Sequence, residues 1–501
     1  MKNQVKSYLL SVILCLSFLS IWACSSSDTD KVEEEKPVSK TLTVNTSKID
    51  FLNAGNDVNV KITTDAINWT SSSDADWIQL NLVTGTKGTT TVKITALKNT
   101  TNATRTGVIT ISADQATSVQ IAVSQVGNTE GLYPSYNTNP LAADASGMSS
   151  TAVQLAAKMK LGWNIGNTME ATGGETAWGN PKVTKALIDL VKANGFNAIR
   201  IPCSWNQYLA NSATAQIKTD WLNRVKEVVQ YCVDNDMYVI VNIHWDGGWL
   251  EKNITEAKKA ETNAKQKAFW EQIATHLRGF DEHLLFASAN EPDVATEAEM
   301  AVLTSYHQTF IDAVRSTGGK NAYRNLIVQG PSTDIEKTNK WMLTLPTDNI
   351  ANRMMVEVHF YPYQFTLMQE DADWGKAFYY WGAGNHSTTD TAHNATYGEE
   401  TDLSKLFLSM KTQFVDKGIP VILGEFGAIR RSNLTGDALA LHLKSRADFY
   451  TFVVKQSKAN GLVPFYWDAG NLGVNTMSLF DRSNNTVFDS QALTGLQDGL
   501  K

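Results

Sequence analysis

Two glutamates close two apolar, strand-like runs of this sequence. Glu291 follows the run at 283–290, and Glu425 ends the run at 420–425. A charged side chain at the end of a buried strand is costly unless the chemistry needs it there. Most glutamates only solvate a surface or pair with a lysine, but these two stand where a strand gives way to a loop. Paired carboxylates facing one pocket can break a glycosidic bond, and we predict that reaction.

Apolar segments alternate with amphipathic helices from residue 151 to residue 501, and this alternation predicts a barrel of parallel strands. A doubly wound sheet is the rival fold, but it needs a Gly-rich phosphate turn after its first strand. Residues 162–166 offer only two glycines, and no acidic partner follows. We therefore predict an α/β fold, a (β/α)8 TIM barrel. The expected strands lie at 161–166, 197–202, 238–244, 284–290, 325–330, 354–360, 420–425 and 462–467.

Polar residues gather at the carboxyl ends of these expected strands, the rim that holds the active site in this fold. Any one of them alone is a weak signal, because a single strand histidine is usually a satisfied core residue. Their convergence on one rim favours a site. The candidate residues are Asn164, Arg200, Asn242, His244, Asn290, Glu291, His359, Tyr361, Glu425 and Trp467.

Residues 41–127 alternate apolar and polar positions in short runs between turn residues, which predicts a small all-β, immunoglobulin-like sandwich ahead of the barrel. Trp69, the segment 76–78, the segment 105–107 and the closing residues 123–127 resemble the BACON domain that precedes many bacterial polysaccharide hydrolases. We interpret the tryptophans as core and the module as a spacer. Residues 128–150 are expected to be a linker with limited hinge freedom, and 151–501 the catalytic domain.

The N-terminus has the pattern of an export signal. Lys2 and Lys6 precede an apolar run at 8–22 that is too short for a lasting membrane span. The end of this run, at Cys24, resembles the bacterial lipobox, which implies a signal peptide at 1–23 and a lipid anchor on that cysteine. Residues 24–40 are acidic and are expected to form a disordered tether, as in surface-exposed outer-membrane lipoproteins of Bacteroidetes-type bacteria.

Composition limits the partners. The net charge of −7 and a pI near 5.7 argue against nucleic acid or anionic lipid as the main partner. The 14 tryptophans suit a protein that stacks on sugars, although a large aromatic core also uses them. Cys203 and Cys232 are expected to be free, buried thiols. We expect a monomer.

Asn290-Glu291-Pro292 and Gly424-Glu425-Phe426-Gly427, taken together across the barrel, resemble glycoside hydrolase family 5. The segment 162–171 further resembles its subfamily four, rich in endo-β-1,4-glucanases and xyloglucanases. The resemblance implies a retaining double displacement with Glu291 as acid/base and Glu425 as nucleophile.

Physical roles follow from those assignments. Arg200 and Tyr361 are expected to hydrogen-bond Glu425, and the charge of Glu425 is expected to raise the pKa of Glu291. Asn290 should donate to the 2-hydroxyl of the reacting sugar. The remaining rim residues would position that sugar, with Trp467 as its floor. These are Asn164, His244 and His359.

Metal catalysis is the rival chemistry, given His244, Asp246 and His359 beside the two glutamates. No His-x-x-x-His motif or cysteine pair supports it, and we expect neither a metal nor a cofactor.

Polymer recognition is expected from the loops. The stretch 361–400 is far longer than an ordinary connection, and a groove lined by aromatic residues would favour internal cleavage. The candidates are Trp178, Trp205, Trp245 and Trp249, together with some of Trp374, Phe378, Tyr379, Tyr380 and Trp381, since others of this loop group must pack the loop itself. The substrate expected is a plant β-glucan polysaccharide, most of all xyloglucan. The alternatives are unbranched or mixed-linkage β-glucan, a mannan, and a non-catalytic glycan-binding lipoprotein.

Overall fold

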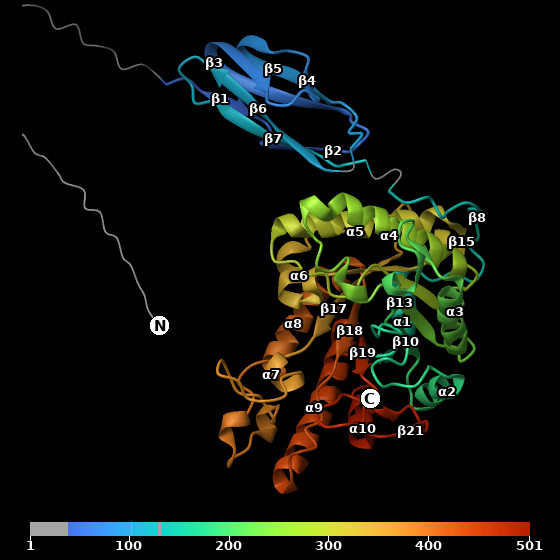
Figure 1. Cartoon of the computed structure of the whole chain (residues 1–501). Coiled ribbons are helices and arrows are strands. Elements are labelled where there is room, and N and C mark those ends of the chain that lie inside the picture. Colours follow the sequence, from blue (N-terminus) through green and yellow to red (C-terminus); the bar gives the residue numbers. More distant parts are fainter. Residues whose placement is uncertain (1–38, 102, 129–131) are drawn as a thin grey trace, which may run out of the picture.

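A closed barrel of eight parallel strands forms the larger part of the chain (Figure 1). The computed structural model describes residues 39–101, 103–128 and 132–501. Each strand pairs with its neighbours in parallel register, and the first strand pairs with the last. The barrel strands are β9 (Gly162–Ile165), β10 (Ala198–Ile201), β13 (Tyr238–Asn242), β14 (Leu284–Ala287), β16 (Leu326–Gln329), β17 (Met354–Phe360), β18 (Val421–Phe426) and β19 (Leu462–Asp468).

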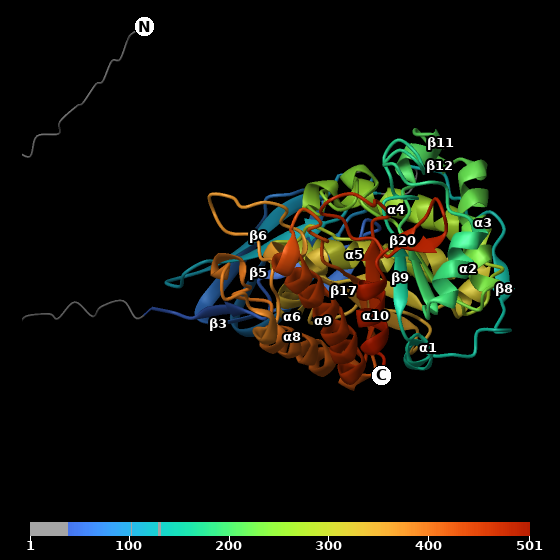
Figure 2. The ribbon, with the colours of Figure 1, turned by 90° about the horizontal axis from the view of Figure 1, so that it is seen from below.

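Helices follow the strands and cover the outside of the barrel (Figures 1 and 2). This strand–helix alternation confirms the predicted (β/α)8 fold, because parallel neighbours need a crossover that packs back on the sheet. The covering helices are α2 (Lys185–Ala193), α3 (Thr219–Val233), α4 (Glu256–Leu277), α5 (Glu297–Ser316), α6 (Ile335–Trp341), α8 (Glu400–Gln413), α9 (Gly436–Asn460) and α10 (Ser490–Asp498).

The interior of the barrel changes from apolar to polar along the strands. Inward residues near the strand starts form an apolar cluster that includes Ile240, Ile327 and Met355. Helix α1 (Ala152–Lys158) closes this end by placing Leu155 in the same cluster. Since side chains on one face of a strand recur every second residue, the next inward positions form another layer. That layer is polar and fully buried, with Asn164, Arg200, Asn242, Gln329 and Glu357.

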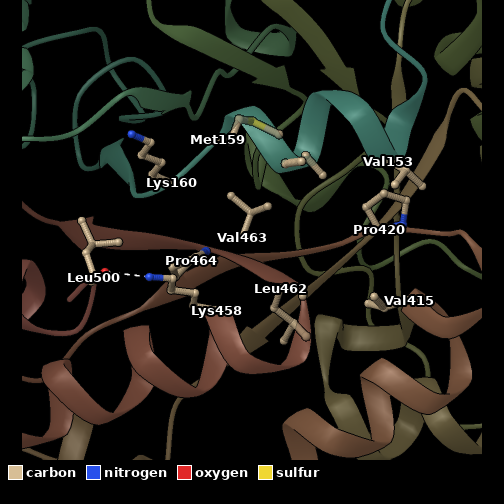
Figure 3. A pocket seen from close by; sticks show the side chains of 13 residues that line it. Val153, Met159, Lys160, Val415, Pro420, Lys458, Leu462, Val463, Pro464 and Leu500 are labelled. Carbon is tan, nitrogen blue, oxygen red and sulfur yellow. Dashed lines mark hydrogen bonds between the residues drawn. The ribbon is translucent and has the colours of Figure 1, made fainter.

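An apolar cavity of about 700 Å³ lies at the closed end of the barrel (Figure 3). Its lining combines α1 with the starts of β18 and β19, including Val153, Pro420 and Leu462. Lys458 stands at this cavity and donates to the carbonyl of Leu500 at 2.8 Å. None of the described residues that line it carries a carboxylate, so this cavity lacks the groups that the predicted chemistry needs.

The N-terminal module is all-β, as predicted. Its strands form one hydrogen-bonded sheet in the order β2-β7-β6-β3-β5-β4, with β1 also on β3. The 17-residue strand β3 pairs with β5 from Asp57 to Thr70, with a register shift between Thr64 and Asn68, and with β6 from Trp69 to Ser73. The strands are β1 (Leu42–Val44), β2 (Lys48–Phe51), β3 (Asp57–Ser73), β4 (Ile78–Leu80), β5 (Thr84–Ala96), β6 (Arg105–Ala113) and β7 (Val119–Gln125).

The aromatic residues of this module pack as core, as we interpreted them. Trp69 is buried between the layers, and a Cβ on Gly85 would lie 2.4 Å from its indole ring. Gly85 therefore makes room for Trp69. Trp77 is half-buried, with the Arg105 guanidinium 4.5 Å above its ring. Cation–π contact of this kind covers a ring that would otherwise face water.

Part of the expected linker contacts the barrel. The backbone N–H of Tyr136 donates to Glu271 at 2.7 Å, and the Ser135 hydroxyl donates to the same carboxylate. A short strand, β8 (Leu141–Ala143), pairs with β15 (Gly318–Gly319). The buried carboxylate on α4 thus offers this backbone a partner that the composition of the segment did not reveal.

Cys203 and Cys232 are free and buried, as expected. Among the described residues, no helix has both the length and the apolar character needed to cross a bilayer. The expected signal peptide, Cys24 and the acidic tether up to residue 38 lie outside the described residues.

We predict that Glu271→Ala releases this segment from the barrel. The change leaves the Tyr136 N–H without its partner, which should lower the free energy of unfolding by about 1–3 kcal/mol. Limited proteolysis should then cut within 128–150 faster than in the wild type, and thermal unfolding should report the lost stability. The matched control is Glu261→Ala on the same helix, whose exposed carboxylate pairs with Lys258. Equal cleavage rates in both variants would contradict the prediction.

Candidate active site

The two predicted glutamates meet at the carboxyl ends of the barrel strands. Glu425 ends the run of β18, and Glu291 follows β14. One oxygen of each carboxylate lies within 4.8 Å of the other. A separation of about 5 Å suits direct covalent attack on the sugar, whereas a water-mediated displacement needs roughly 6.5–9.5 Å. The geometry therefore fits the retaining reaction.

The surroundings of Glu425 agree with the sequence analysis. Arg200 Nη1 donates to Glu425 Oε1 at 2.9 Å, and the Tyr361 hydroxyl donates to Oε2 at 3.1 Å. Only 7% of the Glu425 side chain is exposed. Two donors therefore fix both oxygens of the carboxylate and leave it no freedom to rotate away from the cleft.

Glu291 is held from two sides. His359 Nδ1 lies 2.8 Å from Glu291 Oε1, and the backbone N–H of Glu291 donates to Glu251 Oε1 at 2.9 Å. The side chain remains 45% exposed, so it can reach a ligand in the cleft. Asn290 also hydrogen-bonds Glu251, which ties the Asn-Glu pair to the loop after β13.

In the free enzyme, His359 holds the proton of the cleft. Burial lowers the pKa of His359, but the carboxylates of Glu425, Glu291 and Glu357 outweigh this and raise it to about 9. The surrounding protein desolvates Glu291 and would raise its pKa, yet the hydrogen bond and charge of His359 bring the pKa below its ordinary value. His359 therefore stores the proton that Glu291 needs as an acid.

This arrangement corrects the pKa order that we expected. We predicted a raised pKa for Glu291 because of the neighbouring Glu425. Burial instead raises the pKa of Glu425, with His359 and Arg200 offsetting part of the rise, while the pKa of Glu291 is lowered. The physical reason is that the imidazolium of His359 lies between the carboxylates, a contact that strand order alone did not reveal.

Arg200 is the centre of the polar layer. Its Nη1 donates to Asn164 Oδ1 at 3.0 Å as well as to Glu425, and its Nη2 donates to Asn290 Oδ1 at 2.7 Å. Asn164 in turn donates to the carbonyl of Gly424 at 2.9 Å. Asn164 thus supports the backbone beside Glu425.

The other rim residues also reach the cleft. The His244 ring stacks on Trp467 with centroids 5.6 Å apart. Burial and the charge of Arg200 lower the pKa of His244 well below its usual value, so it is neutral. Asn242 lies below the cleft, where its amide oxygen accepts the backbone N–H of Cys203 at 3.1 Å. The structure therefore brings all the predicted rim residues to one end of the barrel.

Two hollows lie near the glutamates. One of about 430 Å³ is lined by His244, Trp245 and Glu291 among others, and one of about 470 Å³ by His359, Tyr361 and Tyr397 among others. The first contains the Glu291 carboxylate, and the second contains its partner His359.

Asp246 is a loop support in this structure. Its carboxylate accepts the backbone N–H of Asn206 and the indole N–H of Trp249, both at 2.8 Å. The turn at this point is strained, since Trp245 and Asp246 have φ of 38° and 52°. Hydrogen bonds to Asp246 offset that strain and hold Trp245 against the cleft.

Trp205 is a packing residue and not part of a groove. It is fully buried and donates to the carbonyl of Asn242 at 2.9 Å. Phe378, Tyr380 and Trp381 of the long loop after β17 are buried too, in line with the expectation that some of these aromatics pack, and Trp381 packs against Phe449 of α9. Residues that remain exposed on these loops are Trp178, Tyr363, Trp374 and Tyr397.

The sequence analysis missed Glu251 and Glu357. Glu357 is fully buried in β17, two residues before His359, and pairs with Arg200. A charged residue inside the apolar run at 354–360 was a visible signal, since it points inward with His359. Glu251 carried no such signal, because its loop position does not reveal that it accepts the N–H of Glu291.

Comparison with known families identifies both modules. The profile of cellulase, glycosyl hydrolase family 5, matches residues 164–473. The BACON profile, a putative binding domain at the N-terminus, matches residues 68–126.

Curated relatives span nearly the whole chain. The xyloglucan-specific endo-β-1,4-glucanase of Bacteroides ovatus is 37% identical over 511 residues, covering 98% of this chain and 95% of that protein. Endoglucanase A of Paenibacillus barcinonensis is 34% identical over 394 residues, covering 74% of this chain and 94% of that protein.

Solved structures of the same family superpose on most of the chain. A Bacteroides ovatus xyloglucanase of this family, in complex with a XXXG heptasaccharide, superposes with a TM-score of 0.69 at 35% identity, covering 92% of this chain and all of that one. A family 5 xyloglucanase from Paenibacillus pabuli gives 0.64 at 36% identity, covering 70% of this chain and all of that one. The protein therefore belongs to glycoside hydrolase family 5 and is a glycoside hydrolase.

Proposed function

We propose that the protein is an endo-β-1,4-glucanase that acts by double displacement, with Glu425 as nucleophile and Glu291 as acid/base. The observation that carries the assignment is that the two carboxylates differ in burial and in hydrogen-bond partners. Glu425 is buried and held by Arg200 and Tyr361, whereas Glu291 is half exposed and shares a proton with His359. An attacking group must be fixed, and a proton carrier must have a source of protons.

The first displacement uses that shared proton. Glu425 attacks the anomeric carbon while the bond from this carbon to the glycosidic oxygen breaks. The proton on His359 Nδ1, which lies 2.8 Å from Glu291 Oε1, passes to Glu291 and from there to the departing oxygen, so that Glu291 is left ionised and His359 neutral. Asn290, whose Oδ1 accepts from Arg200 and whose amide also donates to Glu251, has its other amide N–H for the sugar 2-hydroxyl.

The second displacement reverses these roles. Once Glu425 carries the sugar it has no charge, and Glu291 takes a proton from a water that attacks the same carbon. The bond to Glu425 breaks and its carboxylate returns to Arg200 and Tyr361. Trp467, held against His244, supplies a flat ring on which the pyranose can stack throughout.

We propose xyloglucan as the substrate. One hollow is lined by Glu291 and another by its partner His359, and exposed aromatic residues remain on the surrounding loops. The relatives named for xyloglucan support the choice, since one of them aligns with 98% of this chain. An unbranched or mixed-linkage β-glucan is the second candidate, because endoglucanases are among the relatives too.

We further propose that the enzyme is a monomer anchored to the outer membrane through a lipid on Cys24 and exposed at the cell surface. The support is the lipobox-like segment that ends at Cys24 and the acidic stretch after it.

Catalytic roles are tested with alanine variants and azide. Glu291→Ala and Glu425→Ala should each lower polysaccharide hydrolysis by about 10³-fold or more while the proteins stay folded, and Glu425→Ala should also lower the melting temperature because it takes a partner from the buried Arg200. Azide should restore turnover of an aryl β-glucoside oligomer in both, giving a β-glycosyl azide from Glu291→Ala and an α-glycosyl azide from Glu425→Ala. NMR of the products distinguishes the anomers. The opposite azides would reverse the assignment, and near-wild-type activity in either variant would remove it.

Substrate choice is tested by parallel digestion of tamarind xyloglucan, barley β-glucan, carboxymethyl cellulose and galactomannan. We expect the highest kcat/KM on xyloglucan, with a rapid fall in viscosity because cleavage is internal. Chromatography of the products should show branched oligosaccharides rather than single sugars. A preference of about tenfold or more for carboxymethyl cellulose or galactomannan would contradict the xyloglucan proposal and leave the catalytic assignment intact.

Anchoring is tested with Cys24→Ala in the full chain. The wild type should partition into the detergent phase and incorporate labelled fatty acid, and the variant should do neither. Protease treatment of intact cells checks surface exposure. Equal partitioning of the two proteins would refute the anchor.

A further inference from the structure

Glu357 lies in the polar layer directly beneath the two glutamates and does not reach the cleft. Its side chain is fully buried, and a buried carboxylate must be paired to persist. It belongs to the middle of β17, opposite Gln329 of β16 and next to Ile422 of β18. A group in this place cannot touch a sugar, so its role must act through other residues.

The Glu357 carboxylate contacts both Arg200, which holds Glu425, and His359, which contacts Glu291. Glu357 Oε1 lies 2.9 Å from Arg200 Nε and 3.2 Å from His359 Nε2. Glu357 Oε2 accepts a hydrogen bond from Gln329 Nε2 at 2.7 Å. One carboxylate oxygen therefore contacts the residue that holds Glu425 and the residue that serves Glu291.

The contact with Glu357 determines which nitrogen of the His359 ring faces Glu291. With Nε2 facing Glu357, that nitrogen carries a hydrogen, and Nδ1 faces Glu291. A carboxylate behind an imidazole sets its tautomer, its orientation and its basicity. Glu357 thereby aims the proton-bearing Nδ1 at Glu291.

The contact with Arg200 is an ion pair beside Nε that lacks hydrogen-bond geometry. Because the guanidinium is planar, a charge held beside Nε favours one direction for Nη1 and Nη2. These two nitrogens reach Glu425 and Asn290. Glu357 thus sets the direction from which the nucleophile is held.

Gly424, the residue before Glu425, lies against the Glu357 carboxylate. A Cβ on Gly424 would lie 2.1 Å from Glu357 Oε1. The register between β17 and β18 also shifts at this point, between the pairs Val358–Leu423 and His359–Glu425. The backbone beside the nucleophile is therefore shaped around the Glu357 carboxylate.

We propose that Glu357 is a positioning residue of the reaction, a buried negative charge that holds Arg200 at the nucleophile and His359 at the acid/base. This inference rests on the proposed roles of Glu425 and Glu291. The charged and titratable groups that face this cluster are Arg200 from β10, His244 after β13, Glu291 after β14, His359 and Tyr361 at the end of β17, and Glu425 from β18.

A charge-swap variant separates charge from packing. It combines Glu357→Gln with Gln329→Glu, so that the two side chains exchange places. The introduced carboxylate on β16 can still accept the Ala289 N–H, as Gln329 Oε1 does at 2.8 Å, and can also accept a hydrogen bond from the introduced amide on β17. The oxygen of that amide still faces Arg200 and His359. Shape, net charge and hydrogen bonds are kept, and only the charge moves one strand away. Glu357→Gln alone is the companion variant.

The pH profile of kcat/KM is the main readout. Moving the charge lowers the pKa of His359, which the Glu357 carboxylate raises, and lowers the pKa of Glu425, which the same charge raises. The alkaline limb reports loss of the shared proton and the acid limb reports protonation of Glu425. Both limbs should therefore move to lower pH, by about one unit. We also expect kcat to fall about tenfold or more with KM little changed.

A direct titration makes the result independent of activity. The ¹⁵N NMR signals of His359, assigned by their loss in His359→Asn, should titrate at lower pH in the swap than in the wild type. Glu282→Gln is the control, since this carboxylate pairs with Lys158 at the closed end of the barrel. It should lower the melting temperature and leave the pH profile in place. Unmoved limbs and an unmoved His359 titration in the swap would overturn the proposal, even if the catalytic roles stand. A wild-type enzyme without activity would instead fault the proposed function.

Discussion

The site depends on one buried guanidinium, that of Arg200. It has no exposed surface, and it contacts the carboxylates of Glu425 and Glu357 at 2.9 Å each. A buried cation of this kind is tolerated only when its partners are fixed and complete. The closed barrel meets this demand, because neighbouring strands bring donors and acceptors to one level without any backbone edge left open. The interaction that balances the buried charge therefore also orients the nucleophile.

The charges around the site also determine which residue carries the proton. Three carboxylates surround the imidazole of His359, and Arg200 supplies a second positive charge among these described groups. The three carboxylates favour a protonated imidazole, and the resulting positive charge of His359 favours an ionised Glu291 in the free enzyme. A sugar that excludes water from the cleft disfavours this charge separation, so the proton moves toward Glu291 when it is needed. The same two carboxylates can therefore act as acid and nucleophile, although their pKa values in the free enzyme are ordered the other way.

Catalysis and substrate choice are carried by different parts of the fold. The reacting groups stand on strand ends or immediately after them, where the barrel holds them within small tolerances. The aromatic residues stand on loops, and in the loop after β17 the side chains of Phe378, Tyr380 and Trp381 are buried, with Phe378 and Trp381 in the barrel core. Few aromatic side chains are then left for the polymer, so the loops determine substrate preference through a small number of exposed rings.

The sequence by itself determined the barrel, the all-β module and the set of rim residues. The reason is that strand periodicity, helix alternation and polar residues at strand ends are local signals, and the closed barrel turns strand ends into neighbours. Only the tertiary structure determined which residues lie beneath the rim residues and which contacts join them. Glu357 and Glu251 gained their roles from cross-strand contacts, Trp205 became core, and the linker became attached through Glu271. The pKa order of the two glutamates was decided there too, because it depends on distances to His359 that sequence spacing does not contain.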